Sequence, residues 1–293
     1  SEAVDAQLAG TNISTQFAPN NTVGAPDKAK TDGVIFKATV NWTPADGQLY
    51  YFTFSEGFRP GLLNRPGGAS GPGGFTVPFE LDTDSVDNFE IGWKLDMFDN
   101  SLRFNGNAFY VDVSDLQTTI FDPNIVNLFF SDNAADAEIY GVEGQITWLP
   151  PAIPGLTINA AFSALDTKIT EVLTPTDDVT KGAELAFAPN FQGNIRARYE
   201  WALDSDFMAY VMPDLNYSGS SRSDIIDIND AEVDDYITVG LAFGVNTANW
   251  SVEIYGDNLN NTNGEISNNF VFDRERVTVI RPRTLGLRAS FNY

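Results

Sequence analysis

Hydrophobic and polar residues alternate along most of this chain with a period of two. In the segment 88–97 every second side chain is apolar, namely Phe89, Ile91, Trp93, Leu95 and Met97. Alternation of this kind predicts a β-strand with one apolar and one polar face. The pattern returns at 34–43 and at 191–201, where polar and charged side chains occupy the second face. We therefore expect a protein built largely from such two-faced strands.

Eleven segments of the chain are strand candidates of this type. They are 34–42, 48–58, 89–97, 102–113, 138–148, 156–164, 191–201, 206–218, 236–245, 250–257 and 284–293. Several are about ten residues long, which is the length that a tilted strand needs to cross a bilayer. No stretch approaches the roughly 18 consecutive apolar residues of a membrane helix. A membrane location therefore has to rest on strands.

The connections between these segments alternate between short and long. The short ones are 44–47, 99–100, 149–155, 202–205 and 246–249, and the long ones are 59–85, 114–137, 165–190, 219–234 and 258–283. Outer-membrane barrels have short periplasmic turns and long extracellular loops, whereas a soluble meander has no reason to gather its long loops at one end. We therefore predict an all-β fold, a transmembrane antiparallel up-and-down β-barrel. A soluble β-sandwich or lectin-like module is the alternative.

Aromatic residues gather near the ends of the predicted strands. They are Trp42, Tyr50, Tyr110, Trp148, Tyr199, Trp201, Tyr217 and Trp250. In a barrel these side chains would form girdles at the two membrane interfaces. The alternative is ordinary strand propensity, because aromatic residues favour any sheet.

The composition agrees with a membrane location and argues against several classes of protein function. Charged residues make up only 19% of the 293 residues, fewer than the roughly 25% of an average soluble domain. The chain has 40 acidic and 17 basic residues and a net charge of -23, which would repel nucleic acid. It contains no cysteine and no histidine, so thiolate chemistry and the commonest general base and metal ligand are absent. We expect no enzyme, no catalytic residue and no cofactor.

Several short motifs follow one another in order along the chain. Residues 50–61 read Tyr-Tyr-Phe-Thr-Phe-Ser-Glu-Gly-Phe-Arg-Pro-Gly, and further motifs stand at 89–94, 108–117, 137–144, 257–259 and 282–284. Together they resemble the barrel strands of TonB-dependent receptors, in that family's order and spacing. The resemblance implies a 22-stranded barrel, of which this chain would hold about eleven C-terminal strands.

The resemblance also implies how the chain is organised and what it contacts. We expect an extracellular loop region at 1–32 and the C-terminal half of the transmembrane barrel at 33–293. The family's plug domain and N-terminal strands are expected outside this chain, in the same precursor or in a separate chain. An open sheet edge would leave unpaired backbone groups in lipid, so the remaining strands are needed as partners. Further expected partners are the TonB complex, the barrel-assembly machinery and outer-membrane lipid.

Two groups of residues are candidates for a specific role. Charged side chains on the polar faces are expected to line the lumen, and these are Glu90, Lys94, Arg103, Arg196, Arg198 and Glu200. The last strand alternates and ends on an aromatic residue, as the family's outer-membrane proteins typically do. That resemblance implies that Phe291 and Tyr293 form a signal for the barrel-assembly machinery.

Two loop motifs invite a functional interpretation that their details do not support. The glycine-rich run at 67–74 lacks the Lys-Ser/Thr pair of a phosphate-binding loop and opens no helix, so we expect a flexible extracellular loop. The acidic residues of 224–235 do not have the spacing of a calcium-binding EF-hand. We expect a solvated acidic loop there and no metal site, with Ca²⁺ binding as the alternative.

These observations predict a protein of the bacterial outer membrane that imports a scarce nutrient by TonB-dependent active transport. The ligand would be a siderophore, cobalamin, a carbohydrate or another organic compound. A passive porin or channel is the main alternative, because its sequence would have the same alternation. An outer-membrane enzyme and a soluble binding module are further alternatives.

Overall fold

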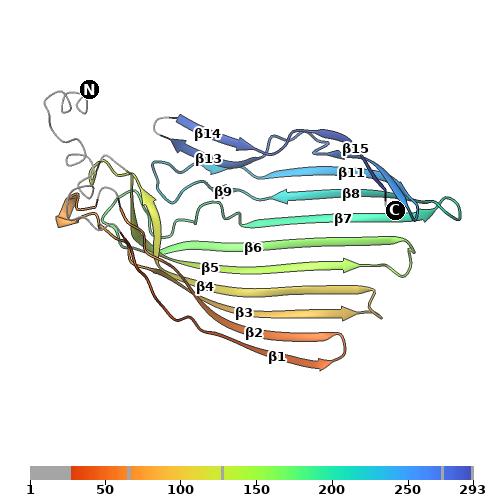
Figure 1. Cartoon of the computed structure of the whole chain (residues 1–293), viewed down its shortest axis with the longest axis horizontal. Helices are drawn as coiled ribbons and strands as arrows, with labels where there is room; N and C mark the ends of the chain where they lie inside the picture. Colours follow the sequence, from red (N-terminus) through yellow and green to blue (C-terminus); the bar gives the residue numbers. More distant parts are fainter. Residues whose placement is uncertain (1–27, 65–66, 127–128, 272–273, 292–293) are drawn as a thin grey trace.

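The chain forms one large antiparallel sheet of eleven strands. The computed structural model describes residues 28–64, 67–126, 129–271 and 274–291. The strand order is β1-β2-β3-β4-β5-β6-β7-β8-β11-β12-β15, so each strand pairs with its neighbours along the chain (Figure 1). The bounds are β1 (Lys37–Ala45), β2 (Gln48–Arg59), β3 (Asp84–Met97), β4 (Leu102–Ile120), β5 (Phe130–Trp148), β6 (Leu156–Val172), β7 (Phe191–Ala202), β8 (Met208–Ser218), β11 (Tyr236–Asn246), β12 (Trp250–Asp257) and β15 (Thr284–Phe291).

Each of these strands coincides with one of the eleven predicted segments, which confirms the all-β antiparallel fold. Short turns join the strands at one end of the sheet and long connections join them at the other (Figure 1). The predicted loop region 1–32 falls mostly outside the described residues. Within the described part of the chain, no helix has the length and apolar character needed to cross a membrane.

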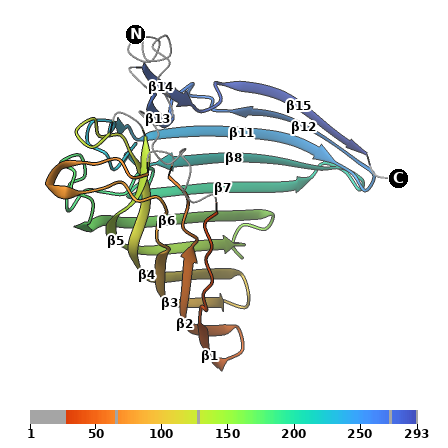
Figure 2. The ribbon, with the colours of Figure 1, turned by 60° about the vertical axis from the view of Figure 1, so that its left-hand side comes forward.

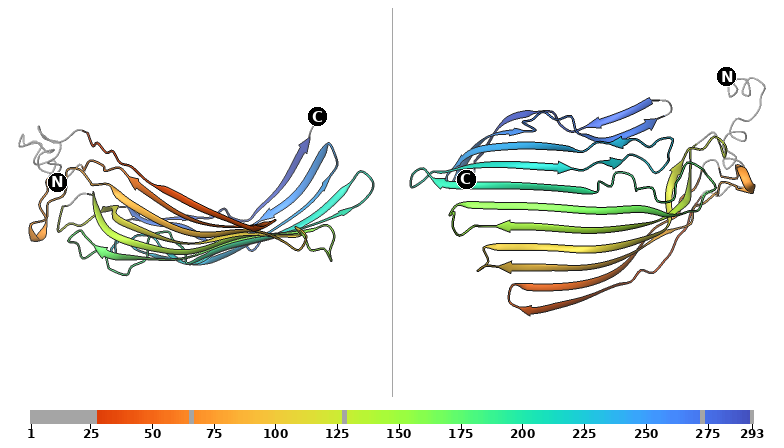
Figure 3. Two further views of the ribbon diagram at one scale, coloured as in Figure 1. Left: turned by 90° about the horizontal axis from the view of Figure 1, so that it is seen from below. Right: turned by 180° about the vertical axis from the view of Figure 1, so that it is seen from behind.

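The sheet is curved and twisted. Seen from below it has the profile of a trough (Figure 3), as expected from the natural twist of strands. The edge strands are β1 and β15, and Figure 2 shows them at opposite sides of the sheet. They do not pair with each other, so the described strands do not close into a barrel.

The strand register gives the sheet one apolar face and one polar face. On the apolar face Val40, Phe52 and Ile91 stand opposite one another on β1, β2 and β3. Val40 is 69% exposed and Ile91 61% exposed, and large apolar side chains are also exposed on β12 and β15. Soluble monomers rarely expose apolar surface that is continuous over so many strands. This face is therefore suited to contact with hydrocarbon.

The strands β4, β5 and β6 continue past their predicted ends on the side of the long connections. A bulge between Val113 and Leu116 shifts the register of β4 against β5, and Asp115 there has a φ of 58°. A bulge inserts an extra residue and therefore interrupts the alternation of faces. Beyond it, Ile120 pairs with Phe130, and both side chains are almost completely buried.

The long connections pack around a hydrophobic core of their own. Val77, Ile125, Val179 and Ile226 come from four different connections and are all buried in one cluster. We call the described parts of 60–83, 121–129, 173–190 and 219–235 the outer cap. The sequence predicts these segments as long surface loops, and the structure shows in addition that they share a core. Burial of each such side chain stabilises the folded state by about 1.5–3 kcal/mol relative to leaving it exposed.

Smaller elements of the connections complete the fold. They are the 3-10 turn η2 (Pro72–Gly74), the ribbon of β9 (Ser221–Arg222) with β10 (Glu232–Val233), and the hairpin of β13 (Glu265–Val271) with β14 (Arg274–Val279). The β13–β14 hairpin belongs to the connection between β12 and β15 and contacts β10. None of these elements follows from the alternation of the sequence.

Candidate functional site

The six charged residues predicted to line the lumen all lie on the polar face of the sheet. Direct cross-strand pairs run from Arg103 through Thr147 and Asn159 to Arg196, which shows that these strands share that face. The six residues form two separate groups, one on β3 and β4 with Glu90, Lys94 and Arg103, the other on β7 with Arg196, Arg198 and Glu200. The structure does not bring them into one site. That the polar face lines the lumen of a complete barrel stays a prediction.

The first group is held by neighbours on the same face. The hydroxyl of Tyr51 on β2 donates a hydrogen bond to the carboxylate of Glu90. The ring of Tyr51 lies over Gly92, where an added Cβ would stand 2.1 Å from the ring. Arg103 donates to the carboxylate of Asp96 over 2.6 Å from Nε to Oδ1. These contacts give Glu90 and Arg103 partners within the wall itself.

Arg198 and Glu200 of the second group belong to a larger polar network, whose side chains come from the four strands β7, β8, β12 and β15. Arg198 donates to Glu200 and stacks over the ring of Tyr210, with the guanidinium carbon 3.5 Å from the ring centroid. The hydroxyl of Tyr210 donates to Glu253 over 2.7 Å, and Arg288 donates to the other oxygen of Glu253, also over 2.7 Å. Sequence analysis missed Tyr210, Glu253 and Arg288, because only the register shows that they meet.

Gly244 makes the contact between Tyr210 and Glu253 possible. Tyr210 lies on β8 and Glu253 on β12, so the tyrosine must cross β11, which separates these strands. A Cβ at Gly244 would stand 2.3 Å from the tyrosine ring. The missing side chain therefore leaves the space in which Tyr210 lies flat across β11.

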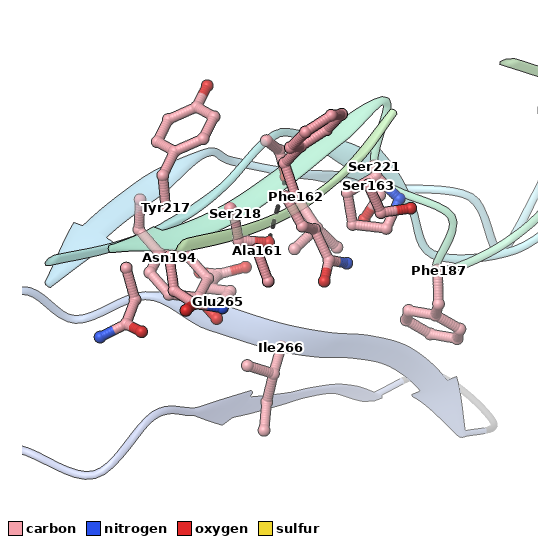
Figure 4. A pocket seen from close by; sticks show the side chains of 17 residues that line it. Ala161, Phe162, Ser163, Phe187, Asn194, Tyr217, Ser218, Ser221, Glu265 and Ile266 are labelled. Atoms are coloured by element: carbon pink, nitrogen blue, oxygen red, sulfur yellow. Dashed lines mark hydrogen bonds between the residues drawn. The ribbon is translucent and has the colours of Figure 1, made fainter. Parts of the chain in front are cut away.

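A cavity of about 510 Å³ lies on the polar face at the end with the long connections. Its wall is formed by β6, β7 and β8, and β13 lies across from them (Figure 4). Phe187 stands at one end of the cavity, whereas the ring of Tyr217 points to the opposite side of the sheet (Figure 4). We call this space the mouth cavity. It is bounded by the sheet on one side and by residues of the long connections on the other.

Uncharged polar side chains of β7 and β8 form a patch on the wall of the mouth cavity. Gln192 and Asn194 on β7 pair with Ser218 and Asn216 on β8, so the four side chains form one patch. Asn216 donates to Asp214 and Thr238. Within the described residues, the amides of Gln192 and Asn194 make no side-chain hydrogen bond, and both residues are exposed. They are therefore free to bind a ligand.

Phe187 is held at the cavity by an uncommon backbone conformation. Its φ is 54°, a value that bulky residues rarely adopt. Its N–H donates to the carbonyl of Arg222 over 2.7 Å, which ties this residue to β9. Such conformations cost energy and persist only where the surroundings enforce them, commonly at ligand sites.

The acidic segment 224–235 forms part of a neighbouring cavity of about 500 Å³. Arg222 donates to Asp230, and this hydrogen bond raises the pKa of the arginine. Burial raises the pKa of Asp224, although the N–H groups of Ile225 and Ile226 donate to its carboxylate and oppose the shift. Across residues 28–64, 67–126, 129–271 and 274–291, no three carboxylates are grouped so that they could hold a metal ion.

The glycine-rich run uses its backbone donors internally. Gly68 donates to the carbonyl of Val77, and Gly71 donates to that of Phe75. Gly68 has a φ of 83° and lies against the ring of Phe79, where a Cβ would stand 2.7 Å from the ring. Glycine is therefore needed for the turn and for close packing. Because these N–H groups are occupied, they are unavailable to cradle a phosphate.

The predicted assembly signal is partly visible. Phe291 pairs with Trp250 across β15 and β12 and is 68% exposed on the apolar face. Tyr293 lies outside the described residues. The role of both residues in assembly stays a prediction.

Comparison with known proteins gives a family and a set of similar folds. Residues 6–259 match the family model described as TonB dependent receptor-like, beta-barrel. Comparison with curated protein sequences finds no significant match. The fold is similar to that of the ferric yersiniabactin uptake receptor FyuA from Yersinia pestis, with a TM-score of 0.69 and 15% identity over 88% of this chain and 37% of that one.

Two further solved structures have a similar fold, with slightly lower TM-scores. The siderophore receptor PiuA from Acinetobacter baumannii has a TM-score of 0.64 and 16% identity, over 86% of this chain and 35% of that one. The ferric citrate transporter FecA has a TM-score of 0.65 and 14% identity, over 88% of this chain and 38% of that one. The chain therefore spans little more than a third of the length of these proteins, and the likeness concerns the fold.

Proposed function

The chain belongs to the TonB-dependent receptor β-barrel family, and on this premise we propose that it forms the C-terminal half of the wall of an active nutrient transporter. The family is one of bacterial outer-membrane receptors and transporters rather than enzymes, so the outer membrane is the location of this chain. In the proposed function the complete receptor binds a scarce nutrient at its outer mouth. The TonB complex then supplies the energy for import.

One observation carries this proposal most directly. The eleven strands form an open, curved sheet whose two faces differ in polarity, and among the described residues no further strand pairs with the outer edges of β1 and β15. Unpaired backbone groups in hydrocarbon cost several kcal/mol each, so both edges need further strands. Eleven more strands would complete the 22-stranded barrel of the family. The polar face would then line a lumen.

The polar networks of the wall support a lumen that is filled by a plug. The groups around Glu90 and around Glu253 present charges, hydroxyls and flat rings on the polar face. A plug domain could make hydrogen bonds with them in place of water. We propose that Lys94, Arg103, Arg196, Arg198 and Glu200 serve this contact together with Glu90.

An experiment on the full-length receptor separates active transport from a passive channel. Purified receptor is tested for binding to the periplasmic domain of TonB, and for ion conductance in a planar bilayer. A plugged TonB-dependent transporter binds this domain and conducts little. Steady open conductance without TonB binding would instead identify a porin and refute the proposal.

A further inference from the structure

We propose that the mouth cavity binds an uncharged, polyhydroxylated group, such as a sugar residue, of the imported ligand. This inference rests on the proposed function and names the chemical class of ligand for its outer site. It depends on three properties of the mouth cavity, which are the polar groups of its wall, its charge, and its aromatic end.

The wall offers paired donors and acceptors without a net charge. The side-chain amides of Gln192, Asn194 and Asn216 each contain one acceptor and two donor hydrogens, and Ser163 and Ser218 add hydroxyls. A sugar hydroxyl is likewise both a donor and an acceptor, so neighbouring hydroxyls can pair with neighbouring amides. Because Gln192 and Asn194 have no side-chain partner among the described residues, binding would not have to break an existing bond there.

The charge of the mouth disfavours an anionic ligand. Glu265 is the one charged residue among the described residues that line the mouth cavity. Its carboxylate can accept hydrogen bonds from two adjacent hydroxyls, but it repels a carboxylate or phosphate. The five long connections 60–84, 114–137, 165–190, 219–235 and 258–283 together contain 21 acidic and 8 basic residues. The resulting negative potential would lower the local concentration of an anionic ferric chelate.

The apolar end of the mouth cavity suits the carbon face of a sugar ring. Phe187 is 44% exposed there, and its backbone is held by the hydrogen bond to Arg222. A preorganised aromatic ring contributes contact area to the bound ligand and loses little conformational freedom on binding. The volume of about 510 Å³ lies within the roughly 300–1,000 Å³ of small-molecule sites.

The test uses the purified full-length receptor and defined probes. Malto-, xylo- and galacto-oligosaccharides represent uncharged ligands, and ferric citrate represents an anionic chelate. Binding is measured for the unaltered receptor, for the double variant Asn194→Ala/Asn216→Ala, and for Gln145→Ala. Gln145 is an exposed amide on the polar face outside the mouth cavity and is the matched control. A folded state is checked for each variant by its compact mobility on unheated gels.

We expect at least one uncharged oligosaccharide to bind, and we expect the double variant to weaken that binding about tenfold or more. Gln145→Ala should leave it unchanged. The inference is overturned if ferric citrate binds and no oligosaccharide does, if no probe binds, or if the double variant binds the sugar normally. TonB binding is measured on the same preparations. If the sugar-binding test fails but the receptor still binds TonB, the inference about the ligand is wrong and the proposed function stands.

Discussion

The side-chain amide of Asn64 forms two hydrogen bonds with the backbone of Ser131, 67 positions further along the chain. Ser131 N–H donates to Asn64 Oδ1 over 2.8 Å, and Asn64 Nδ2 donates to the carbonyl of Ser131 over 2.7 Å. Asn64 Nδ2 also donates to the carbonyl of Pro78 over 2.9 Å. The asparagine therefore joins the first long connection to the tip of β5, and it is only 4% exposed.

Asn64→Asp should open the first long connection of the outer cap. The carboxylate keeps an acceptor for Ser131 N–H but faces the carbonyls of Ser131 and Pro78 without a donor. Leaving such buried groups unpaired costs about 1–3 kcal/mol. We expect hydrogen exchange in 62–82 to become roughly 10- to 100-fold faster. Asn249→Asp, the same change in an exposed turn, should not affect it, and equal exchange in both variants would contradict the assigned role of Asn64.

The strand positions could be predicted from the sequence because each strand separates two environments. A side chain such as Ile91 or Ile195 that faces hydrocarbon must be apolar, and its neighbours on the polar face need not be. This requirement applies to every second residue of a strand. It can be read from the sequence without knowing which strands pair with one another. The sequence therefore predicts the strands, their antiparallel order and the two faces.

The bulge and the outer cap could not be predicted in the same way. The extra residue near Asp115 reverses the alternation, so the regular pattern ends at Val113 although β4 continues to Ile120. Val77 and Ile226 form a core only because their connections lie side by side in space. The network of Tyr210 and Glu253 depends on the register of three strands and on a glycine between them. The alternation of neighbouring residues along the chain does not contain such long-range information.

Gly244→Ala should destabilise the barrel wall by disrupting the hydrogen bond from Tyr210 to Glu253. Tyr210→Phe removes the same hydrogen bond. The added methyl group would push the ring of Tyr210 away from Glu253, and overpacking of this kind costs about 1–3 kcal/mol. Loss of a hydrogen bond to a charged group costs about 1.5–3 kcal/mol. Because both changes break one contact, their effects on the free energy of unfolding should not add.

This coupling can be measured by urea unfolding of the full-length receptor in detergent. Gly57→Ala is the matched control, because a Cβ at Gly57 meets no atom within 4 Å. Its effect should be small and should add to that of Tyr210→Phe. Full additivity of Gly244→Ala with Tyr210→Phe would show that the glycine does not act through this tyrosine.

Ile195→Arg should destabilise the receptor far more than Gln145→Arg. Ile195 lies in the middle of β7 on the apolar face, whereas Gln145 lies within β5 on the polar face. An arginine that faces lipid near the membrane midplane costs about 2–4 kcal/mol, and substitutions that face a lumen mainly alter selectivity. Unfolding of both variants in lipid vesicles gives the two free energies. Equal costs would mean that the face assigned to lipid is wrong.

Phe291 should matter for assembly of the receptor more than for binding of its ligand. It lies on the apolar face opposite Trp250, next to the short-turn end of the sheet. The mouth cavity is at the other end of the strands and on the other face, so Phe291 cannot contact a ligand there. Burial of one such side chain is worth about 1.5–3 kcal/mol, a small part of the stability of a large barrel.

Deletion of residues 291–293 should therefore sharply reduce the amount of receptor in the outer membrane, whereas molecules that do assemble should bind TonB and ligand normally. The amount is measured by quantitative immunoblotting of outer-membrane fractions, and ligand binding is measured per assembled molecule. Leu285→Ala provides the control, because it removes apolar surface from the other end of β15 and leaves residues 291–293 unchanged. Normal membrane levels combined with lost ligand binding would assign residues 291–293 to transport instead of assembly.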